Sequence, residues 1–545
     1  MHKNTNLQIP SICTHQTLSK YLEKLIGLLA LSLIEDDKEN LEEKLNLCRE
    51  LVSTLVFKGN VEVISKNVFG SHVLQTLLQC ITVFQKYDDK LDELLQLFAS
   101  IIEERCLFEL LHHNSGSHVL RTLLKVMANV VDSEPFVKNR KVSDETDIIV
   151  LSGIQISPWR KEKLLHWSQL WRKDLVGILR TNQACATVCL LLKLFKHQNL
   201  LEDEGAEQLV QDLVDATLER CMYCKNSSFA LETCIGVCGI ATYSKVHRDF
   251  ISPNLQALSE NIFANYAVQA FIQNTFFQES HLRTFIEELQ FERLFNTTSS
   301  SIIWRLAEAC VRVGACESLF VKKVFKTLAI EGGINPWVVV ISTGACRNGP
   351  FGADSILNGD KPEGSDGTNT ENAVLNESRI LIKAAGCSIL LHMLKFPQKS
   401  IQPLLDSFRG FLRIATEQSK ILDLACDRHF SRVLQLLLDP KQGLVSEKIV
   451  KAVYDSYKDQ FIQMANNLNG GFVISSLYTA CTPKLKIEML ETLLPQYDAI
   501  CARNRKLVSI IKLDEFKENQ KLFVKKIKKG QSIREMFKDL ITFKF

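Results

Sequence analysis

Apolar and polar side chains alternate along this chain with helical spacing, and residues 67–78 show the pattern most clearly. Their Val and Leu residues lie three and four positions apart, so we expect a helix that buries one apolar face. Ser71 and Gln75 lie one turn apart on another face, with His72 beside them. A small polar residue, a flat ring and an amide together suit contact with a planar, hydrogen-bonding ligand.

The same five-residue window recurs through the chain. Apolar or small residues follow its first residue by two, three, six and seven positions. Neighbouring windows begin about 35 to 46 residues apart, except at two long gaps. This period predicts an α-solenoid, in which each helical unit buries its apolar face against the next unit. The first residues are Ser71, Ser117, Cys185, Ser228, Asn265, Ser300, Cys387, Ser431 and Gly471, with a weaker fit at Ser19.

Breaks in the period predict the organisation of the chain. A tract of Gly, Asp, Asn and Ser has nothing to bury, so it predicts a disordered insertion. Residues 503–545 contain 13 Lys and Arg against 5 Asp and Glu, and this run predicts a basic tail at its end. The predicted segments are a flexible N-terminus at 1–17, repeats at 18–131, an insertion loop at 132–162, repeats at 163–347, a disordered insertion at 348–376, repeats at 377–513 and a basic tail at 514–545.

Composition narrows the function classes. The 65 Lys and Arg residues nearly balance 62 Asp and Glu, so any basic surface must come from the distribution of charge rather than from its excess. Seventeen cysteines without a paired zinc spacing favour reduced, buried thiols in the cytosol or nucleus, and we expect no metal and no cofactor. The longest apolar run, residues 25–34, is too short to span a membrane. No catalytic motif is present, so we expect no enzyme.

The recurring window resembles the base-reading motif of Pumilio-type repeats. In that family three side chains of a helical unit contact one RNA base, two at its edge and one on its face. The resemblance implies a uracil-type window at Asn265, Tyr266 and Gln269. It implies adenine-type and guanine-type windows as well. These are Ser71, His72 and Gln75, with Ser431, Arg432 and Gln435, for adenine, and Ser228, Phe229 and Glu232 for guanine.

Other windows depart from the motif at their fifth residue. Ser117 and His118 are followed by Arg121, which suits a phosphate or an edge contact better than the usual pairing. We expect the remaining units to pack or to position RNA without reading its sequence; their fifth residues are Cys189, Trp304, Leu391 and Ser475. Trp167 and Trp171, four residues apart on an apolar stripe, are expected in the core.

The whole pattern is similar to the divergent Pumilio-like proteins of the nucleolus, and within them to the nucleolar protein nine family. The windows at Ser71, Ser117 and Asn265, residues 309–315 and the break after the second full repeat carry this resemblance. It implies an all-α, right-handed solenoid of three-helix repeats with a curved, U-like form. It also implies a monomer of the nucleus and nucleolus that binds precursor small-subunit ribosomal RNA, together with preribosomal particle proteins, and acts in small-subunit biogenesis without a membrane.

A second interpretation stays open at this point. Armadillo and HEAT solenoids bind extended peptides, and in such a scaffold the small first residues would ease helix packing. Peptide-binding arrays have no reason to repeat a polar-aromatic-amide window in phase with the period. That periodic window therefore favours RNA.

Overall fold

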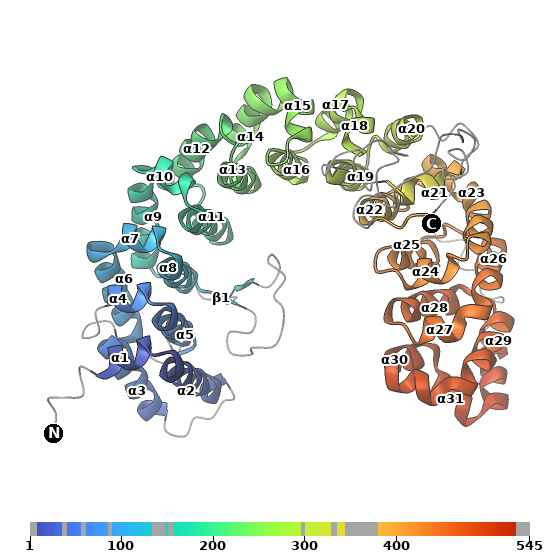
Figure 1. Ribbon diagram of the computed structural model, residues 1–545, viewed down its shortest axis with the longest axis horizontal. Helices are drawn as coiled ribbons and strands as arrows, with labels where there is room; N and C mark the ends of the chain where they lie inside the picture. Colours follow the sequence, from blue (N-terminus) through green and yellow to red (C-terminus); the bar gives the residue numbers. More distant parts are fainter. Residues whose placement is uncertain are drawn as a thin grey trace, which may run out of the picture. The chain divides into compact units, whose positions relative to one another are not determined.

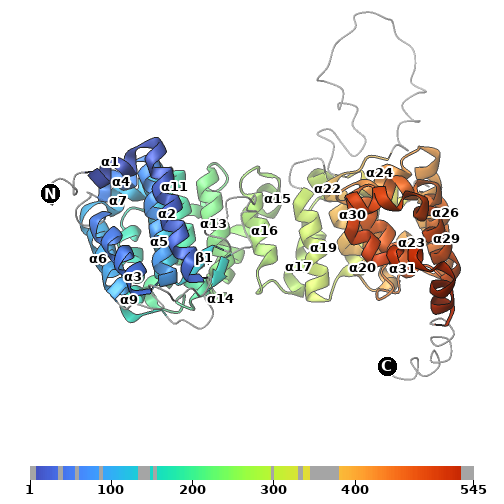
Figure 2. The same ribbon diagram turned by 90° about the horizontal axis from the view of Figure 1, so that it is seen from below.

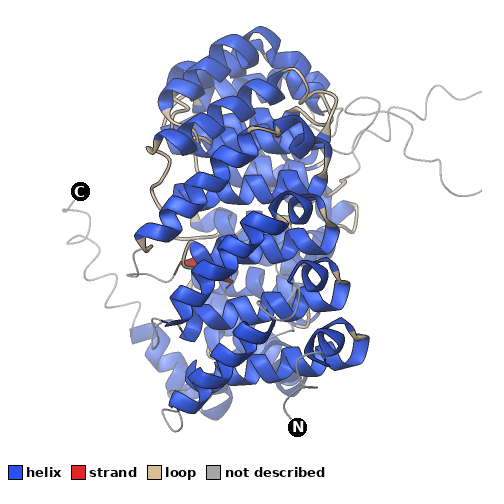
Figure 3. Ribbon diagram, turned by 90° about the vertical axis from the view of Figure 1, so that its left-hand side faces the viewer, coloured by secondary structure: helices blue, strands red, loops and turns tan. Residues whose placement is uncertain are grey.

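The computed structural model describes residues 8–34, 41–55, 61–84, 90–132, 148–150, 156–295, 300–328, 335–343 and 380–529 (Figure 1). Almost all of them are helical, and the one described sheet is the antiparallel pair β1 (Val130–Asp132) and β2 (Ile148–Val150) (Figure 3). The chain divides into two compact units, Met1–Pro253 and Asn254–Phe545. The prediction of an all-α repeat fold is confirmed, and the short strand pair is an addition that the periodicity did not indicate.

The first unit is built from triplets made of a longer helix, a short helix and a third helix that carries the window. The predicted three-helix repeat is therefore present. Its helices are α1 (Gln8–Thr14), α2 (Gln16–Ile34), α3 (Leu41–Ser53), α4 (Val61–Lys66), α5 (Val68–Phe84), α6 (Lys90–Arg105), α7 (Leu107–His112), α8 (Asn114–Met127), α9 (Pro158–Arg172), α10 (Leu175–Arg180), α11 (Asn182–His197), α12 (Glu204–Leu218), α13 (Lys225–Val237) and α14 (Ile240–Val246), followed by the π-helix His247–Ile251.

The second unit continues the same plan after α15 (Ser252–Glu260), which crosses the division between the units. Its helices are α16 (Asn265–Gln273), α17 (Glu279–Glu288), α18 (Phe291–Phe295), α19 (Ser301–Val313), α20 (Glu317–Thr327), α21 (Pro336–Ile341), α22 (Ala384–Met393), α23 (Gln398–Glu417), α24 (Ile421–Cys426), α25 (Phe430–Leu437), α26 (Glu447–Tyr457), α27 (Phe461–Ala465), α28 (Leu468–Ala480), α29 (Pro483–Leu493), α30 (Tyr497–Ile511) and α31 (Leu513–Glu518).

The window-bearing helices pack on one another in chain order, and we call them the ladder helices. In the first unit α2 packs on α5, α5 on α8, α8 on α11 and α11 on α13 (Figures 1 and 2). In the second unit α16 packs on α19, α19 on α22, α22 on α25 and α25 on α28. Each unit therefore places its windows on adjacent, similarly oriented helices.

The core consists of the apolar stripes that the window spacing predicts. Val73, Leu74, Leu77 and Leu78 are all buried, and the equivalent residues of α16 and α25 are buried as well. Trp167 and Trp171 are fully buried, as expected for core residues, with their rings 6.3 Å apart. Burial of such stripes between neighbouring helices supplies the main stabilisation of a solenoid.

Three segment boundaries differ from the sequence-based expectation. Residues 8–17, expected to be flexible, lie in α1 and at the start of α2, and Cys13 is fully buried where α1 packs on α2 and α5. Helix α9 begins at Pro158 inside the predicted insertion loop. Residues 520–529 of the predicted basic tail are helical, and Phe523 packs edge-to-face on Phe516 at 5.6 Å. The predicted insertion at 348–376 lies outside the described residues.

A buried arginine explains why α9 begins so early. Arg160 is only 4% exposed. Its Nε donates to Asp92 Oδ1 at 2.9 Å, and its Nη1 donates to Asn129 Oδ1 at 2.6 Å and to the carbonyl of Val126 at 3.3 Å. Since a buried guanidinium needs such partners, the first turn of α9 must pack against α6 and the end of α8.

Candidate nucleic-acid interface

Side-chain caps fix where several ladder helices begin. Asn67, four residues before Ser71, accepts hydrogen bonds from the backbone N–H groups of Phe69 and Gly70, both at 2.9 Å. Such caps satisfy N–H groups that have no partner inside the helix. Side chains four residues before four other windows do the same; these are His113, Asn261, Asp427 and Asn467. The caps therefore hold the windows in a common register.

A small residue lies just before the first residue of most windows. Four of these residues are glycines, Gly70, Gly116, Gly386 and Gly470, and they abut the short helix of the same repeat. A Cβ atom added to Gly470 would lie 2.6 Å from the carbonyl oxygen of Met464. Side chains larger than hydrogen would thus push the ladder helix away from its short helix.

The first residue of each predicted reading window is buried, which differs from the sequence-based expectation. Ser71, Ser117, Ser228, Asn265 and Ser431 are each 3% exposed or less. The Ser71 hydroxyl donates to the carbonyl of Val68 at 2.9 Å, and that of Ser117 to the carbonyl of Asn114 at 3.0 Å. These side chains are therefore not open hydrogen-bonding groups here, and they shape the surface on which the other two residues stand.

At two other windows the first residue is covered by the following repeat. The Cys185 thiol donates to the carbonyl of Asn226 at 3.3 Å. A Cβ on Gly471 would meet the side chains of Asn504 and Leu507 in the same way. Contacts between consecutive repeats therefore close off the first position at these two windows.

The second residue of each predicted reading window projects into solvent. Tyr266 is 54% exposed, and its helix neighbours Asn265 and Ala267 are buried. The exposed second residues are His72, His118, Phe229, Tyr266 and Arg432, each with a flat ring or a guanidinium group. His118 is only partly covered by its neighbours, but this partial desolvation, followed by the charge of Arg121 and by His72, lowers its pKa and favours the neutral ring at pH 7. Neutral rings and guanidinium planes are suitable surfaces for base stacking.

The fifth residue lies beside the second and is oriented by its own helix. Gln75 Nε2 donates to the carbonyl of Ser71 at 3.1 Å, and Gln435 Nε2 donates to the carbonyl of Ser431 at the same distance. This bond leaves the amide oxygen of each glutamine without a partner among the described residues. Glu232 takes the equivalent position on α13 and is half-buried. Two windows in different units thus present the same amide geometry.

The window of α8 has a different arrangement. Arg121 Nε donates to the carbonyl of Ser117 at 3.3 Å, and its Nη2 lies 3.2 Å from Nδ1 of His118. The guanidinium is therefore held against the ring on its own helix. It presents a positive charge where the other windows present an amide or a carboxylate.

Several windows lack such a reading geometry, in line with their departures from the motif. Cys189 is buried, and Ser475 and Leu391 are half-buried, with no amide or carboxylate to offer. Trp304 stacks on His392 of the next ladder helix, with ring centroids 5.9 Å apart and planes 9° from parallel. The space for a base edge at that repeat is therefore occupied by an indole ring.

Two groups that contribute to the surface were not singled out from the sequence. Lys193 Nζ lies 5.8 Å from the ring centre of Phe229, and Lys506 Nζ lies 5.8 Å from that of Phe472. Asn226 and Asn469, each two residues before a first residue, donate to carbonyls of the preceding repeat, those of Leu179 at 3.1 Å and Cys426 at 3.0 Å. Their recurrent place in the period was the signal that could have identified them.

Other chemistries find little support in the part of the chain that the structure describes. No group of three or more His, Cys, Asp or Glu side chains in the described ranges could hold a metal ion. Among the helices described, none has the length and apolar character needed to cross a lipid bilayer.

Comparison with known proteins places this geometry in a family. The family model described as "NOP9-like PUF repeat domain" matches residues 178–503. The structure described as APUM23-GGAAUUGACGG has a TM-score of 0.70 at 17% identity, covering 95% of this chain and 91% of that chain. APUM23 with its insert region deleted gives a TM-score of 0.69 at 16% identity, with the same coverage. No curated protein sequence matches this chain significantly. The matched family is of PUF repeats, so an armadillo or HEAT fold is not supported.

Proposed function

This chain belongs to the NOP9-like PUF repeat family, and on that basis we propose that it binds RNA along its ladder helices. The observation that carries the proposal is the repeated exposure pattern. Five windows in two units bury the first residue, expose a ring or guanidinium at the second and hold a polar group at the fifth. A random distribution of side chains would not repeat this order of buried, exposed and polar residues once in each helical repeat.

The physical basis of the proposal is stacking combined with edge recognition. A base that lies on His72 or Tyr266 would gain about 1–3 kcal/mol from stacking. The adjacent glutamine or glutamate would hydrogen-bond to the edge of that base. Several such units in register would give sequence-dependent affinity, while lysines and arginines around them contact phosphates.

The windows suggest a base preference for each unit. We propose uracil for Asn265, Tyr266 and Gln269, and guanine for Ser228, Phe229 and Glu232, since a carboxylate accepts from the two N–H donors on the guanine edge. Adenine is proposed for the two windows that end in Gln75 and Gln435. Arg121, beside His118, would contact a phosphate or a base edge.

The solved structures support an RNA ligand in one further way. APUM23, whose fold this chain shares, is paired in those structures with sequences such as GGAAUUGACGG, which contain uracil and are therefore RNA. The family description supports the finer proposal. It is that the chain acts in the nucleus and nucleolus as a monomer, binds precursor small-subunit ribosomal RNA and works beside preribosomal particle proteins in small-subunit biogenesis.

One binding experiment tests the proposal. Fluorescence anisotropy would measure the affinity of the full chain for a labelled transcript that spans the 3′ end of small-subunit ribosomal RNA and its precursor extension. The double variant Tyr266→Ala/Gln269→Ala should bind about 5- to 150-fold more weakly, the equivalent of one lost stacking contact. Tyr223→Ala is the matched control, because Tyr223 is 80% exposed and lies outside the windows.

Two results would contradict the proposal at different levels. Equal affinity of the wild type and the double variant would exclude α16 from the RNA contact. Crosslinking in cells, followed by sequencing of the attached RNA, should recover precursor small-subunit ribosomal RNA. Recovery of messenger RNA alone would overturn the ribosomal part and leave RNA binding in place.

A further inference from the structure

The ladder contains two adjacent repeats that cannot read bases. The windows of α19 and α22 have Ser301 and Ser388 as second residues, which offer no stacking ring. Their fifth residues are Trp304, which is stacked on His392, and Leu391. If RNA follows the ladder of the second unit, it must be held at these two helices by something other than base recognition.

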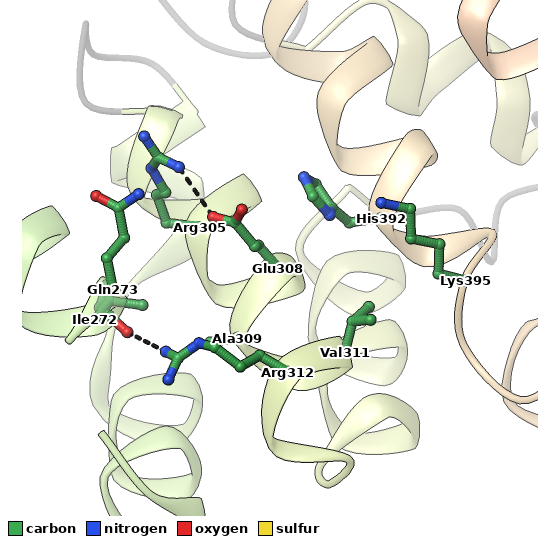
Figure 4. A pocket seen from close by; sticks show the side chains of 9 residues that line it. All are labelled: Ile272, Gln273, Arg305, Glu308, Ala309, Val311, Arg312, His392 and Lys395. Carbon is green, nitrogen blue, oxygen red and sulfur yellow. Dashed lines mark hydrogen bonds and ion pairs between the residues drawn. The ribbon is translucent and has the colours of Figure 1, made fainter. Parts of the chain in front are cut away.

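A basic pocket lies on these same helices, beginning at Arg305, directly after Trp304, and reaching about two turns further along α19 to Arg312. It has a volume of about 280 Å³ and is formed by α16, α19 and the end of α22 (Figure 4). Arg305, Glu308 and Arg312 project from α19, while His392 and Lys395 approach from the other side. Three basic side chains face one carboxylate, so the lining carries net positive charge at pH 7.

The cationic groups of the pocket are held in place before any ligand arrives. Arg305 lies over the Trp304 ring at 3.9 Å and bonds to Glu308 at 2.9 Å. Arg312 donates to the carbonyls of Asn274, at 3.1 Å, and Ile272 at the end of α16. Because side chains that are already ordered lose little entropy on binding, this arrangement favours a small charged ligand.

Hydrogen-bonding capacity remains for such a ligand. A guanidinium has five N–H donors, and Arg305 and Arg312 each use only some of theirs in these bonds. The Lys395 side chain is exposed and makes no hydrogen bond or ion pair with the described residues. Nδ1 of His392 is buried and likewise lacks a hydrogen-bond partner there.

We propose that this pocket binds a phosphodiester group of the RNA backbone, at the point where the ladder stops reading bases. Positive charge, fixed donors and an unused lysine match the oxygens of a phosphate, whereas the windows of these two repeats match no base. The proposal rests on the RNA-binding function proposed above. It adds that α19 and α22 carry the strand by its backbone, without sequence preference.

The dependence of RNA affinity on salt gives the first test. A protein that loses one phosphate contact to single-stranded RNA releases fewer counterions, so the slope of log K against log salt falls in magnitude by about 0.7. We expect this fall for Lys395→Gln, with the same RNA transcript and the full chain. Lys484→Gln is the matched control, since Lys484 is a highly exposed lysine on α29, which carries no window and does not line the pocket. Lys395→Glu should lower affinity further at low salt.

Inorganic phosphate gives a second test that does not involve RNA. The fluorescence of Trp304, taken as the difference between the wild type and Trp304→Phe, should change as phosphate replaces chloride at constant ionic strength. Lys395→Glu should require a higher phosphate concentration for the same change. Both variants alter exposed or half-buried side chains, so circular dichroism can confirm that the fold is retained.

The two tests separate failure of this proposal from failure of the proposed function. If the wild type binds RNA and Lys395→Gln keeps the wild-type slope, the pocket does not hold the RNA backbone, and RNA binding stands. A Trp304 response to phosphate together with an unchanged slope identifies a site for free phosphate and overturns the assignment to RNA. If the wild type binds no RNA, both proposals are wrong.

Discussion

The side-chain amide of Gln269 donates a hydrogen bond of 2.9 Å to Oδ1 of Asn265, one turn earlier on α16. This differs from Gln75 and Gln435, whose amides bond to backbone carbonyls of their own helices. The identity of the first residue therefore sets the direction of the glutamine amide, although the first residue is itself buried. Base preference would then depend on a contact inside the protein.

The Asn265–Gln269 bond predicts that the base preference of one window can be transferred to another. The double variant Asn265→Ser/Tyr266→Arg gives α16 the same three side chains as Ser431, Arg432 and Gln435. With no Asn265 amide oxygen to accept, Gln269 should bond to the backbone carbonyl of residue 265, and the preference at this position should move from uracil to adenine. The expected discrimination is about 1–3 kcal/mol, as for a well-formed base contact.

Competition binding with RNAs that differ at one position measures this exchange. Tyr266→Arg alone serves as the control, because it changes the stacking group and leaves the Asn265–Gln269 bond intact. An unchanged preference in the double variant, with affinity retained, would contradict the idea that the first residue orients the fifth.

Close packing at the start of the ladder helices predicts a large effect of a single methyl group. In Gly470→Ala the new Cβ would lie 2.6 Å from the carbonyl oxygen and 2.8 Å from the Cα of Met464, both backbone atoms that cannot rotate away. We expect the free energy of unfolding to fall by about 1–3 kcal/mol.

Gly236→Ala, at a position with no atom within 4 Å of the new Cβ, should instead gain about 0.5–1 kcal/mol from the reduced backbone entropy of the unfolded chain. Urea denaturation followed by circular dichroism measures both, and equal effects of the two variants would show that the close approach is not a constraint.

The sequence predicts the ladder helices well because their apolar spacing is a local property. Residues two, three, six and seven positions after each first residue lie on one face whatever surrounds the helix, and in α5 all four are buried. Burial of the first residue, in contrast, cannot be predicted from the local spacing of apolar residues. At Cys185 this cover comes from Asn226 of the next repeat, and one sequence does not reveal how closely two repeats approach.

Two of the three segment boundaries that differ from the sequence-based expectation do so for different reasons. Ser157 and Pro158 form a helix-start signal, since proline is favoured in the first turn, and the structure begins α9 there. That signal lies inside the segment where the repeat period breaks, so the spacing of apolar residues does not mark it as the start of a repeat helix. The N-terminal segment is different, because α1 is only seven residues long and is stabilised by packing against α2 and α5, which its own sequence does not encode.

Arg160 provides a prediction about the join between α9 and the preceding repeat. Arg160→Ala removes a buried cation that bonds to Asp92, Asn129 and the carbonyl of Val126. The variant removes the cationic partner of Asp92, which is partly exposed and keeps the hydrogen bond from the Trp159 indole, so we expect a loss of about 1–3 kcal/mol in the free energy of unfolding. The neighbouring Lys161→Ala should cost at most about 1 kcal/mol, because the Lys161 side chain is 45% exposed and its ion pair with Asp203 is open to solvent. Urea denaturation measures both variants. Equal losses in the free energy of unfolding would show that burial of Arg160 does not contribute to stability.

The environment of His392 predicts how acid affects the second unit. Burial lowers its pKa from the ordinary value of 6.5, and Lys395 and Arg305 lower it further, while Glu308 opposes them. Below pH 6.5 the unfolded chain therefore takes up a proton on this histidine more readily than the folded chain does. The free energy of unfolding falls as the pH drops through 6.5, and above that pH His392 does not lower it. His392→Gln should reduce the drop in melting temperature between pH 8 and pH 5.5, whereas His197→Gln, an exposed position at the end of α11, serves as the control for removal of a histidine. A drop in His392→Gln as large as in the wild type would mean that His392 is protonated in the folded protein as readily as in the unfolded chain.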